Sequence, residues 1–337
     1  MKLNKNIFFT MILYLSINSV FAEKTDLNHI YKLALQENAN AQNELGILYA
    51  NGRGISQNSV KAMEWYSKAA DQGYAAAQHN LGAMYENGRG ISQNYVKAVE
   101  WYSKAADQAF APSGYNLGLM YSKGRGVKQD HTKAFEWYSK AANEGNVFAQ
   151  LNLGVMYANG QGVIQNDVKA VEWYSKAANQ GVAQAQVNLG IMYETGRGIT
   201  QDYTKAVEWY SKAANQENTL AQFNLGATYH NGLIVKKNYT KAREWYSKAA
   251  KHGDVKSQFN LGIMYALGQG VNRDDSKAFE WFKKAAEQGD AQAQFNIGAM
   301  YSNGQGVDQN EYLSKRWFLK AAENGHSQAK SLIATLP

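Results

Sequence analysis

The sequence predicts an all-α solenoid, a stack of paired antiparallel helices in which each pair packs only against its neighbours. Three observations favour this fold. The chain's eight tryptophans lie at a constant interval of 36 residues. Each interval holds two stretches with the apolar spacing of a helix, separated by a glycine-rich turn. A further glycine recurs inside the first stretch of every copy. The tryptophans are Trp65, Trp101, Trp137, Trp173, Trp209, Trp245, Trp281 and Trp317.

The N-terminal segment, residues 1–22, has the layout of a secretory signal peptide. Lys2 and Lys5 precede a mostly apolar stretch at 7–21, and Ala22 ends it with a small residue at the expected cleavage point. An uncleaved membrane anchor is the alternative, but the apolar stretch is short for a bilayer span. We therefore expect an exported protein, periplasmic or secreted, without an integral membrane span after cleavage.

The rest of the chain divides into an array and its two ends. Residues 23–39 are expected to form an N-terminal capping helix, because part of this segment resembles a lone second helix of the repeat. Residues 40–327 contain the eight tandem repeats, and residues 328–337 begin one further first helix as a C-terminal capping half-repeat. Terminal copies with altered faces are expected, since each has a neighbour on only one side.

The first helix of each copy is predicted from its apolar stripe. In the second copy, Ala77, Leu81, Met84 and Tyr85 are spaced as one face of a helix. The turn at 88–90, Gly-Arg-Gly, ends this helix because glycine tolerates the positive φ of a tight turn.

The second helix follows a predicted N-cap. Asn94 precedes Ala98, Trp101, Tyr102 and Ala105, which again recur at helical spacing. In seven copies a glutamate precedes a lysine by four residues, which predicts an ion pair on the helix surface. These pairs are Glu64 with Lys68, Glu100 with Lys104, Glu136 with Lys140, Glu172 with Lys176, Glu208 with Lys212, Glu244 with Lys248 and Glu280 with Lys284.

A glycine inside every first helix needs an explanation, because glycine in a helix costs about 0.5–1 kcal/mol relative to alanine. Its recurrence predicts that a large ring or a neighbouring backbone occupies the space beside it. The recurring tryptophan and tyrosine are the natural occupants, and we expect both to belong to the core. The glycines are Gly46, Gly82, Gly118, Gly154, Gly190, Gly226, Gly262 and Gly298.

Composition excludes several kinds of site. The chain has no cysteine, which excludes disulfides, thiolate metal sites and cysteine nucleophiles. The formal net charge is +7, but no basic run of the kind that binds nucleic acid is present. The six histidines share no register and form no metal-binding spacing. We expect no metal, no cofactor and no nucleic-acid partner.

Two segments of the fourth copy carry a family resemblance. The run at 149–157, Ala-Gln-Leu-Asn-Leu-Gly-Val-Met-Tyr, and the run at 169–178, Lys-Ala-Val-Glu-Trp-Tyr-Ser-Lys-Ala-Ala, resemble the Sel-one-like repeat (SLR), a relative of the tetratricopeptide repeat (TPR). The resemblance implies a right-handed, TPR-like superhelix of paired antiparallel helices. It also implies an adaptor, since bacterial members are often exported and mediate protein–protein contacts. Some secreted relatives carry disulfides and are linked to β-lactam or cell-wall-peptide binding, and their cysteines are missing here.

One register of the first helix varies between copies and lies opposite the Ala-Leu-Met stripe. It changes from polar to aromatic along the array, which predicts an apolar ladder on the concave face that suits a helical or extended peptide. Its apolar members are candidate partner-binding residues, and packing between adjacent first helices is the alternative. The register reads Asn43, His79, Tyr115, Leu151, Val187, Phe223, Phe259 and Phe295. The groove borders are expected at Glu86, Ser122, Glu194 and His230.

The residue between the two turn glycines also varies. Arg53, Arg89, Arg125 and Arg197 occupy this place in four of the first five copies and are candidates for a ridge that binds carboxylates or phosphates. Solvated turn residues are the alternative. The sixth copy reads Leu-Ile-Val at 233–235, and the missing glycine is expected to deform its turn.

No catalytic constellation is found. The Gly-x-Gly turns follow a helix instead of a strand, and the recurring serines lack a histidine partner. The sequence therefore predicts a non-enzymatic, exported bacterial scaffold that binds a protein or peptide partner through the concave face of the solenoid. The alternative is a cell-wall-related protein that binds or hydrolyses a β-lactam-like or peptidoglycan-derived ligand. The oligomeric state is left open.

Overall fold

The computed structural model describes residues 27–232 and 236–335. The expected signal peptide at 1–22, the first residues of the N-terminal cap and the altered turn at 233–235 lie outside the described residues. The described part is all helical, with eighteen helices and no strand in these two ranges, and the prediction of an all-α solenoid of paired helices is confirmed.

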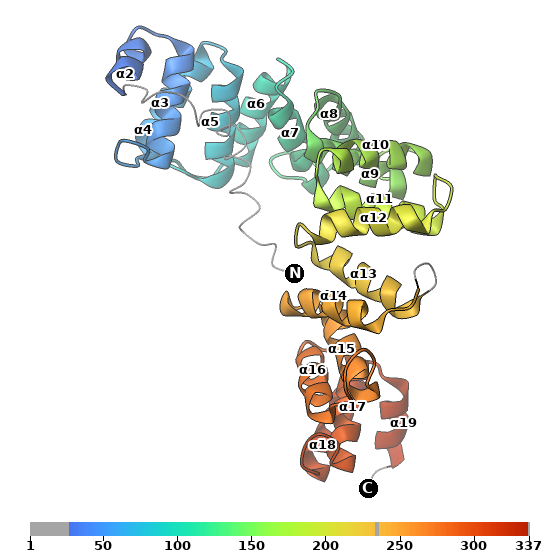
Figure 1. Ribbon diagram of the computed structural model, residues 1–337. Coiled ribbons are helices and arrows are strands. Elements are labelled where there is room, and N and C mark those ends of the chain that lie inside the picture. The colour runs from blue at the N-terminus through green and yellow to red at the C-terminus, as the bar shows by residue number, and fades with distance from the viewer. Residues whose placement is uncertain (1–26, 233–235, 336–337) are drawn as a thin grey trace. The chain divides into compact units, whose positions relative to one another are not determined.

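The helices alternate as the repeat predicts (Figure 1). The first helices of the copies are α3 (Ala39–Asn51), α5 (Ala75–Asn87), α7 (Ala111–Lys123), α9 (Val147–Asn159), α11 (Ala183–Thr195), α13 (Thr219–Asn231), α15 (Val255–Leu267) and α17 (Ala291–Asn303). The second helices are α4 (Ser59–Asp71), α6 (Tyr95–Ala106), α8 (His131–Asn143), α10 (Asp167–Asn179), α12 (Tyr203–Ala214), α14 (Tyr239–Lys251), α16 (Asp275–Glu287) and α18 (Glu311–Glu323). The flanking helices are α2 (Leu27–Leu35) and α19 (Ser327–Thr335).

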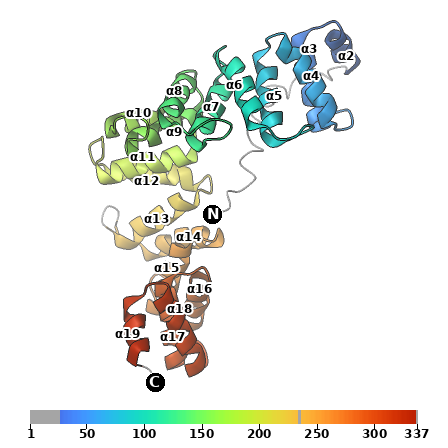
Figure 2. The ribbon, with the colours of Figure 1, turned by 180° about the vertical axis from the view of Figure 1, so that it is seen from behind.

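The chain forms two compact units, unit 1 (Met1–Ala149) and unit 2 (Gln150–Pro337), with the boundary inside α9. In unit 1 each helix from α2 to α8 packs against the next along the chain. The same succession runs from α10 to α19 in unit 2, and Figure 2 shows it from behind. Within each unit, a first helix therefore lies between two neighbouring helices of the succession, as expected for a stack of hairpins.

The turns and caps form as predicted. Gly88 ends α5 with φ +65°, and its N–H donates to the carbonyl of Met84. The side chain of Asn94 accepts a hydrogen bond from the backbone N–H of Lys97 at 3.0 Å, which caps α6. These local devices fix where each helix starts and stops.

The recurring glycine of the first helix lies under an aromatic ring of the second helix of the same copy. A Cβ placed on Gly46 would lie 2.5 Å from Cδ1 of Tyr66, a distance that the ring does not allow. The same contact joins Gly82 to Tyr102, Gly118 to Tyr138, Gly154 to Tyr174, Gly190 to Tyr210, Gly226 to Tyr246, Gly262 to Phe282 and Gly298 to Phe318. The occupant of the space is thus the tyrosine, or the phenylalanine that replaces it.

The tryptophans are placed differently from the prediction that they belong to the core. Trp65 is buried, whereas the other seven are half-buried. A lysine ammonium lies over each indole, 3.9–4.4 Å from the ring centroid. These lysines are Lys68, Lys104, Lys140, Lys176, Lys212, Lys248, Lys284 and Lys320.

The predicted glutamate–lysine ion pairs are therefore wrong. In the part of the chain that the structure describes, none of the seven pairs is among the ion pairs, which join other residues. The lysine instead takes the cation–π position over the tryptophan three residues before it, a contact worth about 0.5–1 kcal/mol at an exposed site. Its stem also covers apolar surface of the ring.

These placements predict opposite ranks for two neighbouring residues of α10. Tyr174→Ala removes a ring that is 4% exposed, and we expect the free energy of unfolding to fall by about 3–5 kcal/mol. Trp173→Ala removes a half-buried ring, and the expected loss is about 1–3 kcal/mol. Urea unfolding followed by circular dichroism measures both.

The exposed Glu172→Ala on the same helix is the matched control, with an expected change within about 0.5 kcal/mol because its carboxylate has no ion pair to lose. A larger loss for Trp173→Ala than for Tyr174→Ala would contradict the assignment of the core.

Candidate partner-binding site

The predicted ladder register is not uniformly exposed. Asn43 and Val187 are buried, with 6% and 0% of their surface exposed, so Val187 offers no contact surface. The other six members are half-buried: His79, Tyr115, Leu151, Phe223, Phe259 and Phe295. The register therefore presents surface in six copies and contributes to the interior in two.

Each aromatic ladder residue lies against the buried ring of the second helix in its own copy. The ring centroids are 5.9 Å apart for Phe223 and Tyr246 and 5.2 Å apart for Phe295 and Phe318. Tilted pairs at such distances are favourable aromatic contacts. One side of each aromatic ladder ring thus packs on the second helix of its own copy, while another part of the ring stays exposed. This contact differs from the packing between adjacent first helices that was the alternative for this register.

The histidine of the register, His79, is half-buried, and its imidazole lies among other aromatic rings. The imidazole of His79 lies 5.4 Å from both Tyr102 and Phe110, and its Nδ1 is 2.9 Å from the hydroxyl of Ser113. Burial among these groups disfavours the charged imidazolium and lowers the pKa of His79 from 6.5 to about 4. His79 is therefore neutral at pH 7 and adds no charge to the ladder.

The C-terminal end of the ladder opens on a cavity. Phe295 stacks on His326 with ring centroids 4.3 Å apart and planes at 12°. Beside it lies an open cavity of about 540 Å³, lined by Phe295, Ser327, Gln328, Ser331 and Leu332. The hollow is shallow and widely open to solvent, so it can receive one side chain of a partner at its surface but does not enclose a ligand.

The predicted groove borders have partners within the repeat. Glu86 accepts a hydrogen bond from the hydroxyl of Tyr102 at 2.7 Å, and Glu194 accepts one from Tyr210. Nε2 of His230 lies 3.0 Å from Oε1 of Gln269 in the next copy. These side chains therefore satisfy buried tyrosines or join copies. The sequence signal for this hydrogen bond is a glutamate sixteen residues before the tyrosine. The two residues lie on different helices, so the spacing is missed when each helix is interpreted alone.

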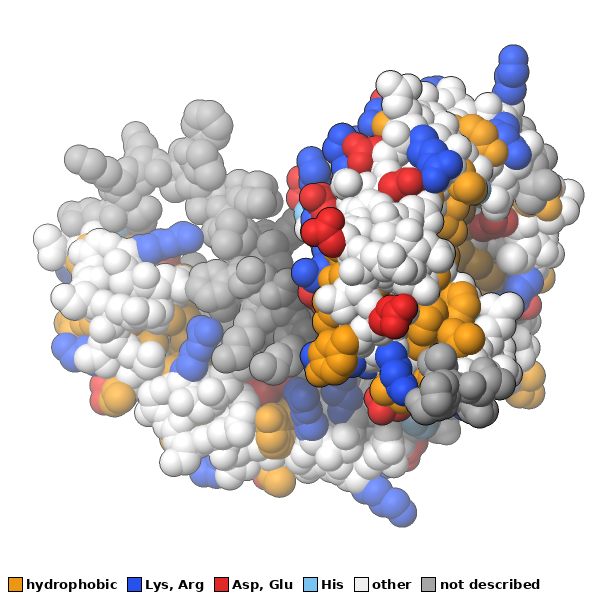
Figure 3. Space-filling model, turned by 90° about the horizontal axis from the view of Figure 1, so that it is seen from below, with side chains coloured by type: hydrophobic (Ala, Val, Ile, Leu, Met, Phe, Trp, Pro, Cys, Tyr) orange, Lys and Arg blue, Asp and Glu red, His pale blue; other side chains and the backbone are white. Residues whose placement is uncertain are grey.

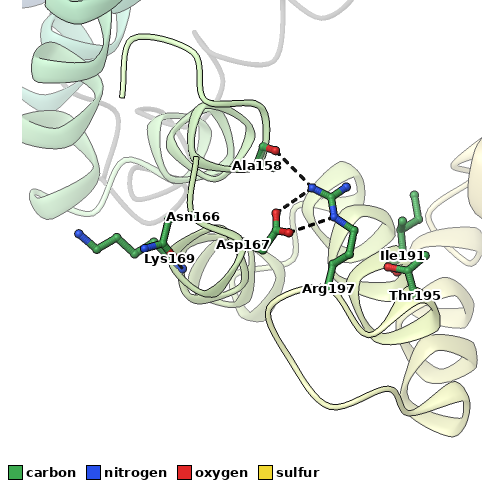
Figure 4. Close-up of polar contacts among 7 residues, drawn as sticks. All are labelled: Ala158, Asn166, Asp167, Lys169, Ile191, Thr195 and Arg197. Atoms are coloured by element: carbon green, nitrogen blue, oxygen red, sulfur yellow. Dashed lines mark hydrogen bonds and ion pairs between the residues drawn. The ribbon is translucent and has the colours of Figure 1, made fainter. Parts of the chain in front are cut away.

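The turn arginines differ in their surroundings. Arg197 donates to both carboxylate oxygens of Asp167, the nearer at 2.7 Å, and to the carbonyl of Ala158 (Figure 4). This bidentate pair raises the pKa of Arg197 and already supplies its carboxylate. The guanidinium of Arg125 lies over the ring of Tyr95, 5.8 Å from its centroid. Arg53 and Arg89 are exposed.

Comparison with known proteins agrees with the observed repeat. The Sel1 repeat model matches eight consecutive segments, 39–74, 75–110, 112–146, 147–182, 183–218, 219–254, 255–290 and 291–326. The chain belongs to the Sel1 repeat family. No curated protein matches the chain.

Two solved structures are similar to this Sel1 repeat chain over nearly its whole length. One is a protective antigen present in uropathogenic Escherichia coli strains with an SLR fold, at 34% identity and a TM-score of 0.72, covering 98% of this chain and 82% of that one. The other is a Sel1 repeat protein from Oxalobacter formigenes, at 32% identity and a TM-score of 0.71, covering 97% and 93% respectively. Both support the observed succession of helices.

The Sel1 repeats also leave apolar side chains outside the ladder. Figure 3 shows hydrophobic side chains gathered in patches on one face, with charged side chains between them. Leu220, Leu267 and Leu319 are exposed by 44%, 64% and 39%. Within residues 27–232 and 236–335, no group of three or more acidic or histidine side chains is arranged to hold a metal, and no helix is long and apolar enough to span a membrane.

The enclosed histidine predicts a pH dependence of stability. Because the folded-state pKa of His79 is below its unfolded value, the unfolded chain binds the proton first as the pH falls. The free energy of unfolding is therefore expected to decrease between about pH 6.5 and pH 4, by up to roughly 3 kcal/mol from this group. His79→Phe, which places here the residue of the last three copies, should remove that part of the loss.

Urea unfolding at pH 7 and pH 4.5 measures the effect. The exposed His29→Phe is the control and should keep the wild-type dependence. An unchanged pH dependence in His79→Phe would contradict the proposed burial of a neutral imidazole.

Proposed function

We propose that this Sel1 repeat chain is an exported bacterial scaffold whose ladder of half-buried rings binds a protein or peptide partner. Sel1 repeat solenoids are generally scaffolds for protein–protein interaction. The observation that carries the proposal is the repetition of one partly exposed apolar position on several first helices. Each aromatic ring at this position packs against a buried ring of the second helix.

The ladder suits binding because its rings are already ordered. A ring that packs on one side loses little conformational freedom when a partner covers the other, so more of the contact energy remains as affinity. Aromatic side chains are also enriched at the centres of protein interfaces. Phe223, Phe259 and Phe295 form the most apolar stretch, and the cavity beside Phe295 offers a pocket for one anchoring side chain of the partner.

Export is part of the proposal. It rests on the positive start, the apolar stretch and the small residue of segment 1–22. The similar Escherichia coli protein is a protective antigen, a role that fits a protein outside the cytoplasm. Expression in a bacterial host should yield a mature chain that begins at Glu23, as measured by intact mass and N-terminal sequencing of the periplasmic fraction. A full-length chain that stays in the cytoplasm would contradict export.

The ladder is tested by the triple variant Phe223→Ser, Phe259→Ser and Phe295→Ser. We expect it to lose the partner that the wild-type protein captures by crosslinking from envelope or host lysate, since its three apolar contacts are gone. The helical circular dichroism should be retained, while the melting temperature falls because each ring also packs on its own copy. Crosslinked complexes are measured by mass spectrometry.

A matched control places three serines at exposed leucines of the same copies, Leu220, Leu267 and Leu319. This variant should capture the same partner as the wild type. Equal capture by the ladder variant would contradict the proposal, and loss of helicity in that variant would assign the rings to packing alone.

The second candidate function is the alternative that the sequence leaves open, the binding of a small peptidoglycan-derived molecule, for which the hollow beside Phe295 offers only a shallow, open surface. The serines of this hollow, Ser327 and Ser331, offer hydroxyls, but neither hydroxyl is hydrogen-bonded to a histidine among the described residues. A chromogenic β-lactam separates the two candidates at low cost. The scaffold proposal predicts no turnover above the uncatalysed rate, and saturable hydrolysis would overturn it.

A further inference from the structure

A second surface lies along the glycine turns of unit 1. The turns of copies 2 and 3 lie on the start of the second helix of the preceding copy. A Cβ placed on Gly90 would lie 2.5 Å from the carbonyl oxygen of Ser59 and 3.0 Å from the nitrogen of Val60. Arg89, which precedes Gly90, is thereby held beside the first turn of α4. Arg125 is held likewise beside α6, where its guanidinium lies over Tyr95.

Apolar side chains are exposed at the same place. Val60 and Val96 are the second residues of α4 and α6, and each is 55% exposed. Arginine and valine therefore follow one another along this side of unit 1, which we name the turn edge. The turn edge consists of Arg53, Val60, Arg89, Val96 and Arg125.

The turn edge has an excess of positive charge. The first turns of α4, α6 and α8 contain no acidic residue, and Lys61 and Lys97 add ammonium groups there. The one acidic cap of these three helices is Asp130 of α8, whose side chain accepts a hydrogen bond from the backbone N–H of Lys133. Within the described residues, no carboxylate of the chain forms an ion pair with Arg53, Arg89 or Arg125.

The same register in unit 2 shows what is missing in unit 1. Asp167 is the first residue of α10, and the corresponding residues are Ser59 in α4 and Tyr95 in α6. The carboxylate of Asp167 accepts hydrogen bonds from Nε and Nη2 of Arg197. The turn geometry thus brings an arginine to the correct place for a bidentate carboxylate pair. Arg89 and Arg125, in copies 2 and 3, form no such pair among the described residues, so the place opposite each is open to a carboxylate of another molecule.

We propose that the turn edge is a docking surface for an acidic segment of a partner protein. The partner's carboxylates take the positions that Asp167 occupies against Arg197, and its apolar side chains cover Val60 and Val96. Arginine favours such planar, bidentate pairs. The exposed valines favour a polypeptide over a phosphate polymer, which has no apolar side chain to place against them. This surface is separate from the ladder and goes beyond the function proposed for it.

The test uses a labelled peptide of alternating glutamate and valine as the probe and fluorescence anisotropy as the readout. The variant Arg53→Glu, Arg89→Glu and Arg125→Glu should bind it about tenfold or more weakly than the wild type, and added salt should weaken wild-type binding. The control, Lys251→Glu, Lys283→Glu and Lys330→Glu, changes the net charge equally at exposed sites of unit 2 and should bind within about twofold of the wild type.

Three further arms make the result decisive. Val60→Ser with Val96→Ser should weaken binding of the glutamate–valine peptide but not of a glutamate–glycine peptide. Inorganic polyphosphate should bind less tightly than the peptide. The ladder variant should bind the peptide as the wild type does, so that failure of the turn edge and failure of the ladder are told apart.

Equal affinity of the wild type and the arginine variant would overturn the proposal, as would an equal loss in the lysine control. Tighter binding of polyphosphate with no effect of the valine substitutions would assign the edge to polyanions and would also overturn it. Circular dichroism of the arginine variant should match that of the wild type, because all three side chains are exposed.

Discussion

The contact between a helix glycine and the aromatic ring of the paired helix is the constraint on which the rest of the structure depends. It recurs in all eight copies, and the space beside the glycine is too small for a Cβ in any of them. The glycine lets the two helices approach, and the ring fills the volume between them. The intrinsic helix cost of glycine is offset by this burial, which explains why no copy replaces it with alanine.

This contact fixes the roles of the neighbouring residues. With the tyrosine inside, the adjacent tryptophan is turned toward the edge of the interior, where a lysine covers its exposed face. The tyrosine hydroxyl needs a partner at the end of the buried ring, and Glu86 supplies it for Tyr102. The aromatic ladder residues pack against the same ring. Core, edge and candidate binding surface are thus placed by one interaction.

The sequence was sufficient for the fold because all eight copies repeat the same helical period and seven of them repeat both turn glycines. The sequence was insufficient where two adjacent aromatic residues of the helix could each have entered the core. Trp173 and Tyr174 are adjacent aromatic residues, and the structure buries only Tyr174, whose ring lies against Gly154 of the paired helix. Contacts between copies were also missed: Arg197 meets a carboxylate thirty residues away. These contacts join residues of different copies, so the sequence of one repeat does not contain both partners. Val187 is fully buried, although six other members of its register are half-buried.

The most direct measurement of the central constraint is a double-mutant cycle between Gly190 and Tyr210 in unit 2. Gly190→Ala alone is expected to destabilise by about 1–3 kcal/mol, because its methyl group meets the ring of Tyr210. Beside Tyr210→Leu, a smaller and flexible side chain, the same alanine should cost much less, giving a coupling energy above about 1 kcal/mol. Additive effects of the two substitutions would contradict the account, since they would show that glycine and ring do not share one space.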